Sequence, residues 1–173
     1  MSIHASKVLS RVVPTVFVLI SSAVEWPLAG QSTESQRVWL VGLQGVQVIV
    51  GPIADEARRG GLDSAQIVAD VELRLREAGV PIRADAPALY VVVSAGKRSE
   101  DAENEFFYFH VQSSLFQSVR LTRQPATTLR AATWTLGLIG SVGPSTFASY
   151  VRDRIHDITD RFINDYLASN PKR

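Results

Sequence analysis

The residues best suited to chemistry lie near the carboxyl end of the chain, where one histidine stands among three aspartates. Asp153, His156, Asp157 and Asp160 are three and four residues apart, so a helix would place them on one side. Imidazole and carboxylate groups of this kind can ligate a metal ion. Arginines are interspersed with them, and charge pairs on a solvated helix face explain the same pattern. Because no known ligand spacing is matched, the sequence favours charge pairs and predicts no metal or cofactor.

A second histidine, His110, lies in the middle of an alternating apolar and polar segment. A general base needs a nucleophile or a carboxylate within reach, and the sequence supplies neither at a recognised spacing. The serines form no G-x-S-x-G or S-x-x-K motif. The glycine-rich stretches 60–61 and 137–143 lack the lysine of a phosphate loop and the spacing of a dinucleotide fingerprint. The sequence therefore predicts no catalytic residue.

The composition excludes several classes of protein. The chain has no cysteine, which rules out thiolate metal sites, cysteine nucleophiles and a lipid anchor on cysteine. Two of the 18 basic residues and one of the 17 acidic residues lie in the first thirty, which leaves 16 of each in the remainder. Nucleic-acid binding needs a basic patch, so this balanced charge predicts no nucleic-acid partner.

The first thirty residues have the pattern of a secretory signal peptide. Lys7 and Arg11 precede an uncharged, mostly apolar run from Val12 to Val24 that contains Pro14. A membrane span needs about 20 apolar residues, whereas a signal peptide needs about 7–15. The sequence predicts a signal peptide over 1–30, a flexible mature amino terminus over 31–37, and a periplasmic or extracellular protein that is not an integral membrane protein once processed. An uncleaved anchor is the alternative.

The first half of the mature chain predicts a strand and a helix. The β-branched stretch Val38 to Val50 is interpreted as a strand bent at its glycines. Asp63 begins a capped helix whose apolar residues recur every three or four positions, and Gly79 ends it. A short strand over 80–83 is expected to follow. Trp39 and Trp134 could stack on sugar rings, although core packing is the more usual place for a tryptophan in a strand.

The second half predicts three strands and a final helix. Ala88 to Ala95 and 128–139 are expected strands, and an apolar stripe from Phe147 to Tyr166 predicts the helix. Strands joined by short hairpins are antiparallel, and helices gather on one face of such a sheet. We predict an α+β fold in a single domain over 38–170. It is a two-layer α/β sandwich, with a mainly antiparallel sheet of about four strands and two helices packed on one face.

The clearest pattern is the alternation from Phe106 to Arg123, which is longer than an ordinary strand and is expected to bend at Ser113–Ser114. Its odd positions are predicted to be core: Phe107, Phe109, Val111, Leu115, Val119 and Leu121. Its even positions would then lie on a face that the two helices leave open. The predicted binding residues on that face are Phe106, Tyr108, His110 and Phe116.

Four segments of the chain resemble short secreted bacterial proteins of unknown function. They are Leu43-Gln44-Gly45-Val46, the stretch from Val71 to Gly79, Thr133-Trp134 and the stretch from Phe162 to Leu167. The overall plan also resembles the amino-terminal domain of the periplasmic protein TolB and small envelope-assembly lipoproteins. The chain departs from the lipoproteins because it has no cysteine to lipidate. The resemblance implies no catalytic residues.

The expected function is a non-enzymatic, envelope-associated binding or assembly module. It would bind an envelope protein or a glycan through the open sheet face or a sheet edge. The alternative is a small hydrolase whose site is assembled from residues distant in sequence. A third option is a structural homo-oligomer formed through the sheet face.

Overall fold

The computed structural model describes residues 34–99 and 105–171. The predicted signal peptide lies outside the described residues, so its cleavage stays a prediction. Within the described ranges, no helix is both long and apolar enough to cross a bilayer.

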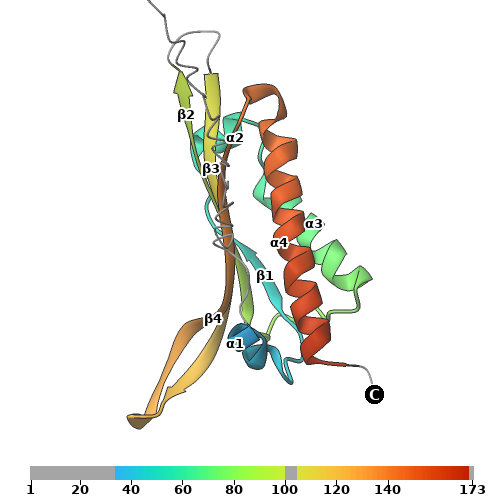
Figure 1. Cartoon of the computed structure of the whole chain (residues 1–173), viewed down its shortest axis with the longest axis vertical. Coiled ribbons are helices and arrows are strands. Elements are labelled where there is room, and N and C mark those ends of the chain that lie inside the picture. Colours follow the sequence, from blue (N-terminus) through green and yellow to red (C-terminus); the bar gives the residue numbers. More distant parts are fainter. Residues whose placement is uncertain (1–33, 100–104, 172–173) are drawn as a thin grey trace, which may run out of the picture.

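A four-stranded mixed sheet forms one layer of the protein (Figure 1). Its strands are β1 (Gln47–Val50), β2 (Ala88–Ser99), β3 (Glu105–Leu121) and β4 (Gln124–Val142), in that spatial order. β1 runs parallel to β2, while β2, β3 and β4 are antiparallel. The crossover from β1 to β2 contains a helix, as is usual for a parallel connection. The predicted α+β fold, with a mainly antiparallel sheet of four strands, is confirmed.

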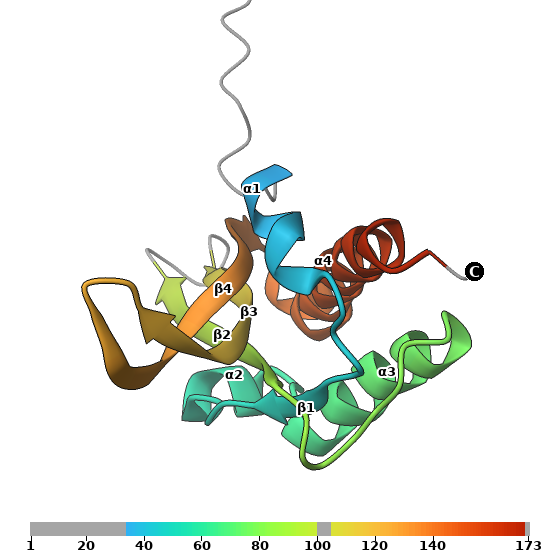
Figure 2. The same cartoon turned by 90° about the horizontal axis from the view of Figure 1, so that it is seen from below.

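The helices form the second layer. α3 (Ser64–Glu77) and α4 (Phe147–Ser169) lie side by side over one face of the sheet, as Figures 1 and 2 show. α3 begins as predicted, because the Asp63 carboxylate accepts a hydrogen bond from the Gln66 amide at 2.9 Å. It ends as predicted at Gly79, whose φ of 79° favours glycine. The shorter elements are α1 (Glu34–Arg37), the 3-10 helix η1 (Val38–Leu40), α2 (Asp55–Arg59) and the 3-10 helix η2 (Pro144–Thr146).

The predicted first strand over Val38 to Val50 is wrong in its first half. Residues 38–40 form η1, and only residues 47–50 are a strand. Leu40, Leu43 and Val46 are all buried, so this stretch turns one side chain in three toward the core. Gly45 has a φ of 144°, and a Cβ there would lie 2.5 Å from the Pro81 carbonyl oxygen. The backbone therefore coils tightly where the β-branched residues alone suggested an extended strand.

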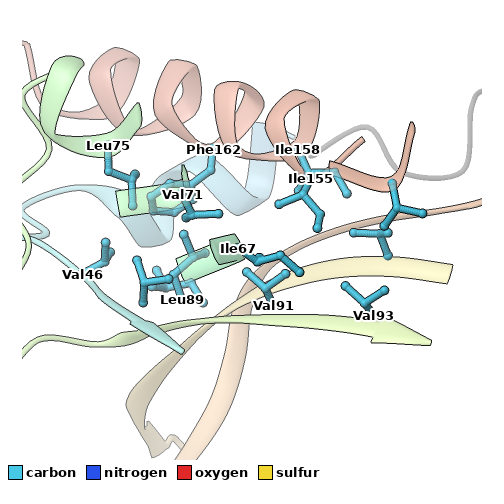
Figure 3. Packing of buried hydrophobic residues seen from close by; sticks show 14 of the residues in the cluster. Val46, Ile67, Val71, Leu75, Leu89, Val91, Val93, Ile155, Ile158 and Phe162 are labelled. Atoms are coloured by element: carbon cyan, nitrogen blue, oxygen red, sulfur yellow. The ribbon is translucent and has the colours of Figure 1, made fainter. Parts of the chain in front are cut away.

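The core lies between the sheet and the two long helices (Figure 3). Ile67, Val71 and Leu75 of α3 recur at intervals of four and all are buried. The facing residues of α4 and β2 fill the same layer: Leu89, Val91, Val93, Ile155, Ile158 and Phe162. The residues that the helix periodicity and the strand alternation place inward thus belong to one core.

β3 confirms the predicted alternation along most of its length. Phe107, Phe109, Val111 and Leu115 are at most 5% exposed. Val119 and Leu121 are only partly buried, because the end of the β3–β4 hairpin extends past the helices (Figure 1). The pairing with β4 is irregular between Leu115 and Phe116, where Thr133 is skipped in the register, and again between Arg120 and Leu121, but not at Ser113–Ser114.

A buried carboxylate connects three distant segments. Asp165 of α4 is fully buried and accepts hydrogen bonds from Trp134 Nε1 at 3.0 Å and from Arg37 Nε at 2.7 Å. Trp134 is buried, as predicted, whereas Trp39 is 55% exposed and is not a core residue. Asp165 therefore fixes α1 and β4 against the end of α4.

Candidate functional site

All four predicted binding residues lie on the sheet face opposite α3 and α4. Their neighbours Phe107 and Phe109 are buried under the helices, so strand alternation turns Phe106, Tyr108 and His110 the other way. Phe116 reaches the same face beyond the bulge. At about 3.3 Å per residue, Phe106 and Phe116 lie roughly 33 Å apart along β3. A ligand that contacts the whole row would have to be a macromolecule or an extended chain.

The structure brings Tyr108 and His110 together with Ile139 of β4. Ile139 is the cross-strand partner of His110 and is 81% exposed, the highest value among the described large apolar residues. Tyr108 is 55% exposed, and His110 is partly buried between them. Together with Ser94 and Ser141, these residues line a shallow hollow of about 530 Å³, which we call the central patch.

The Tyr108 ring lies over a glycine of the neighbouring strand, its cross-strand partner Gly96. A Cβ placed on Gly96 would overlap the Oη and Cζ atoms of Tyr108. The tyrosine ring therefore occupies the space over Gly96, where any other residue would displace it. The ring thus covers the β2 backbone at Gly96, while the Tyr108 side chain stays 55% exposed. A fixed, exposed aromatic ring loses little entropy on binding.

Phe116 belongs to a separate cluster. Its ring contacts Tyr90 edge to face, with the ring centroids 6.2 Å apart, and both residues are partly buried. Polar side chains separate this pair from the central patch: Ser114 and Thr135 share a 2.7 Å hydrogen bond, and Gln112 donates to Ser114 at 3.0 Å. The four predicted residues thus share one face, but Tyr108 and His110 belong to the central patch, Phe116 lies with Tyr90, and Phe106 lies in neither group.

Sequence reasoning missed Ile139 as a site residue. Leu136 and Leu138 were expected to share a strand face with Trp134, which places Ile139 on the opposite face. Both leucines are packed against the core, and Ile139 accordingly points outward. This signal was present in the sequence, but it becomes informative only once the outward face is known to be open.

The central patch does not assemble a catalytic group among the described residues. His110 stands directly across from Ser94, which pairs a base with a hydroxyl. However, the described residues of this face include no carboxylate that could orient the imidazole. A serine nucleophile needs nucleophile, base and orienter in mutual contact.

Two of the three aspartates around His156, Asp157 and Asp160, form charge pairs with arginines. Asp160 accepts two hydrogen bonds from Arg74 of α3, at 2.8 and 2.9 Å. Arg152 donates to Asp70 at 2.9 and 2.7 Å, and His156 Nε2 lies 3.7 Å from the same carboxylate. These pairs join α3 to α4. In the described part of the chain, no three potential ligand side chains gather around a common point.

Comparisons with known proteins give structural similarity only. No family model matches the chain, and no curated protein matches it. A minor lipoprotein from Acinetobacter baumannii is similar, with 12% identity over 74% of this chain and 93% of its own, at a TM-score of 0.37. The rare lipoprotein B of Shewanella oneidensis is similar over 71% of this chain and 94% of its own, with 15% identity and a TM-score of 0.33. The resemblance to the amino-terminal domain of TolB stays a prediction.

Proposed function

We propose that this protein is a non-enzymatic binding module of the cell envelope that recognises a partner protein through its open sheet face. The observation that carries the proposal is the central patch. There, Tyr108 and Ile139 are 55% and 81% exposed on a face that neither long helix covers.

The chemistry of the patch fits a protein partner better than a sugar. The Tyr108 ring could stack on either, but an aliphatic side chain as exposed as Ile139 needs apolar side chains to cover it. The polar residues Ser94, His110 and Ser141 line the same hollow as the two apolar residues. Interfaces between proteins commonly have this anatomy, with an aromatic and aliphatic centre inside a polar rim.

The cell envelope is the proposed location because of the leader. Its short positive segment and apolar run have the pattern of a signal peptide, and the chain has no cysteine for lipid attachment. Mass spectrometry of the protein from its native host tests this part, with cleavage expected between about residues 23 and 31. An intact Met1 on protein in the membrane fraction would contradict it.

The binding proposal is tested by Tyr108→Ala against a control matched in exposure. Leu73 of α3 is also 55% exposed but lies on a helix, so Leu73→Ala removes similar apolar surface elsewhere. Capture of proteins from an envelope extract should lose a specific partner with Tyr108→Ala and keep it with Leu73→Ala. Equal capture by both variants, with both folded, would refute the proposal, and competition by a soluble glycan would replace the protein partner with a sugar.

A further inference from the structure

β4 is an edge strand whose outer side is unusually unprotected. Exposed edges in natural proteins usually carry charges or prolines that prevent pairing with another chain. Arg123, Pro125 and Arg130 protect the distal part of the hairpin in this way. By contrast, the sequence from Ala131 to Val151 contains no charged residue. Residues 131–142 of the edge therefore carry no charge or proline, and α1 lies beside the edge at Thr135.

One hydrogen bond shows which backbone groups of β4 point away from the sheet. The Thr135 amide donates to Gln36 Oε1 at 2.9 Å, and Gln36 belongs to α1, beside the outer side of β4 (Figure 2). In an antiparallel strand, the backbone groups of alternate residues point to opposite sides. The N–H and C=O groups of Gly137, Ile139 and Ser141 therefore point outward as well. Gln36 satisfies the first donor of this series.

These outward groups fit a second copy of the same strand. A two-fold axis at Ile139 pairs Ile139 with its own counterpart and Gly137 with Ser141, through about six hydrogen bonds. No like charges meet in this register, because the paired segment is uncharged. The two exposed Ile139 side chains would lie next to each other on the same sheet face.

Other exposed apolar residues flank the same edge. Val38, Trp39 and Val41 are 67%, 55% and 67% exposed, and η1 packs against β4. A single pair of strands buries little side-chain surface, whereas stable dimers bury about 1,200 Å² or more. Apolar side chains beside the strand supply further surface for a second copy to cover.

We infer that the protein forms a two-fold dimer in which β4 pairs antiparallel with β4 of a second copy, with Ile139 at the axis. The pairing joins the two sheets into one and leaves the Tyr108 rings on its continuous open face. Ile139 belongs to both the central patch and the dimer edge, whereas Tyr108 lies one strand inside the edge, so variants at residue 108 distinguish this inference from the proposed function.

The natural absence of cysteine makes a direct crosslinking test possible. Residues facing each other in a hydrogen-bonded antiparallel pair have Cα atoms about 5.5 Å apart, within the range that a disulfide spans. The full chain with Ile139→Cys should form a covalent dimer rapidly under mild oxidation. Tyr108→Cys is the control, because residue 108 is exposed but lies one strand inside the edge. Equal crosslinking of the two variants, or crosslinking of the Ile139→Cys variant only to another protein, would overturn the inference.

A pair of variants at Ser141 tests the backbone pairing itself. Ser141→Pro removes an outward N–H, and Ser141→Ala keeps it. Sedimentation should show a dimer affinity weakened about tenfold or more by proline and little changed by alanine. Tyr108→Ala should leave the dimer intact while losing the partner, so the two proposals fail separately. A wild-type protein that stays monomeric at every concentration would also overturn the inference.

Discussion

Truncating two adjacent residues of β3 should give very different losses of stability. Phe109 is 3% exposed, packs edge to face on Tyr150 at 5.8 Å, and fills the space over Gly140. A Cβ on Gly140 would lie only 2.8 Å from the Phe109 ring, so the ring fits closely. Phe109→Ala should reduce the free energy of unfolding by about 3–5 kcal/mol, since the cavity adds to the lost transfer energy.

Tyr108→Ala should cost much less. With the side chain 55% exposed, somewhat less than half of the roughly 200 Å² of a tyrosine is buried. At about 25 cal/mol per Å², that area corresponds to about 2 kcal/mol as an upper bound. No closed cavity forms, because solvent reaches the site. We therefore expect a loss of about 1–2 kcal/mol.

Urea denaturation of the two variants and the wild type measures both losses. The comparison is valid if the slope of the unfolding free energy against urea concentration is the same for all three proteins. An equal slope means that only the stability has changed. Equal losses at Tyr108 and Phe109 would mean that both faces of β3 are buried. The two-layer description, and with it the open face, would then be wrong.

Three further changes have defined outcomes. Asp165→Ala should lower the free energy of unfolding by about 2–4 kcal/mol, because it leaves the buried Trp134 N–H without an acceptor, and Asp165→Asn should cost less in the same urea assay. Ser113→Ala should leave the free energy of unfolding unchanged or raise it by about 1 kcal/mol, because the Ser113 hydroxyl is buried without a partner among the described residues. A clear loss of stability would mean that this hydroxyl does form a hydrogen bond in the folded protein. Burial raises the pKa of Tyr166, so the unfolded chain loses this proton first, and stability should fall as pH rises above about 10. Tyr166→Phe should make stability less dependent on alkaline pH, and an unchanged pH profile would assign the dependence to other groups.

The alternation of β3 and the periodicity of α3 and α4 were enough to predict the architecture. Each pattern specifies which side chains face the core, and the capping residue Asp63 and the terminal Gly79 mark the ends of α3. The beginning of the domain could not be predicted in the same way. The spacing of Leu40, Leu43 and Val46 does not by itself indicate a strand or a coil, because most of their neighbours are also apolar. The coil there depends on the close approach of Gly45 to Pro81.

The candidate site was predictable only in part. Alternation placed Tyr108 and His110 on one face, but their grouping with Ile139 depends on the register of β4, which a bulge shifts by one residue. The separation of Phe116 from this group depends on its contact with Tyr90, a residue of another strand. The contacts of Asp165 were likewise hidden, since Trp134 is 31 residues away and Arg37 is 128 residues away in sequence.

Binding of a partner protein to the open face around Tyr108 can be measured in the cell. The most direct measurement is site-specific photocrosslinking in the native cell, with the reactive group placed at residue 108 or at the equally exposed residue 73. We expect a discrete crosslinked protein from residue 108 and none from residue 73. The absence of a crosslink at residue 108, or the same crosslinks at both positions, would contradict it.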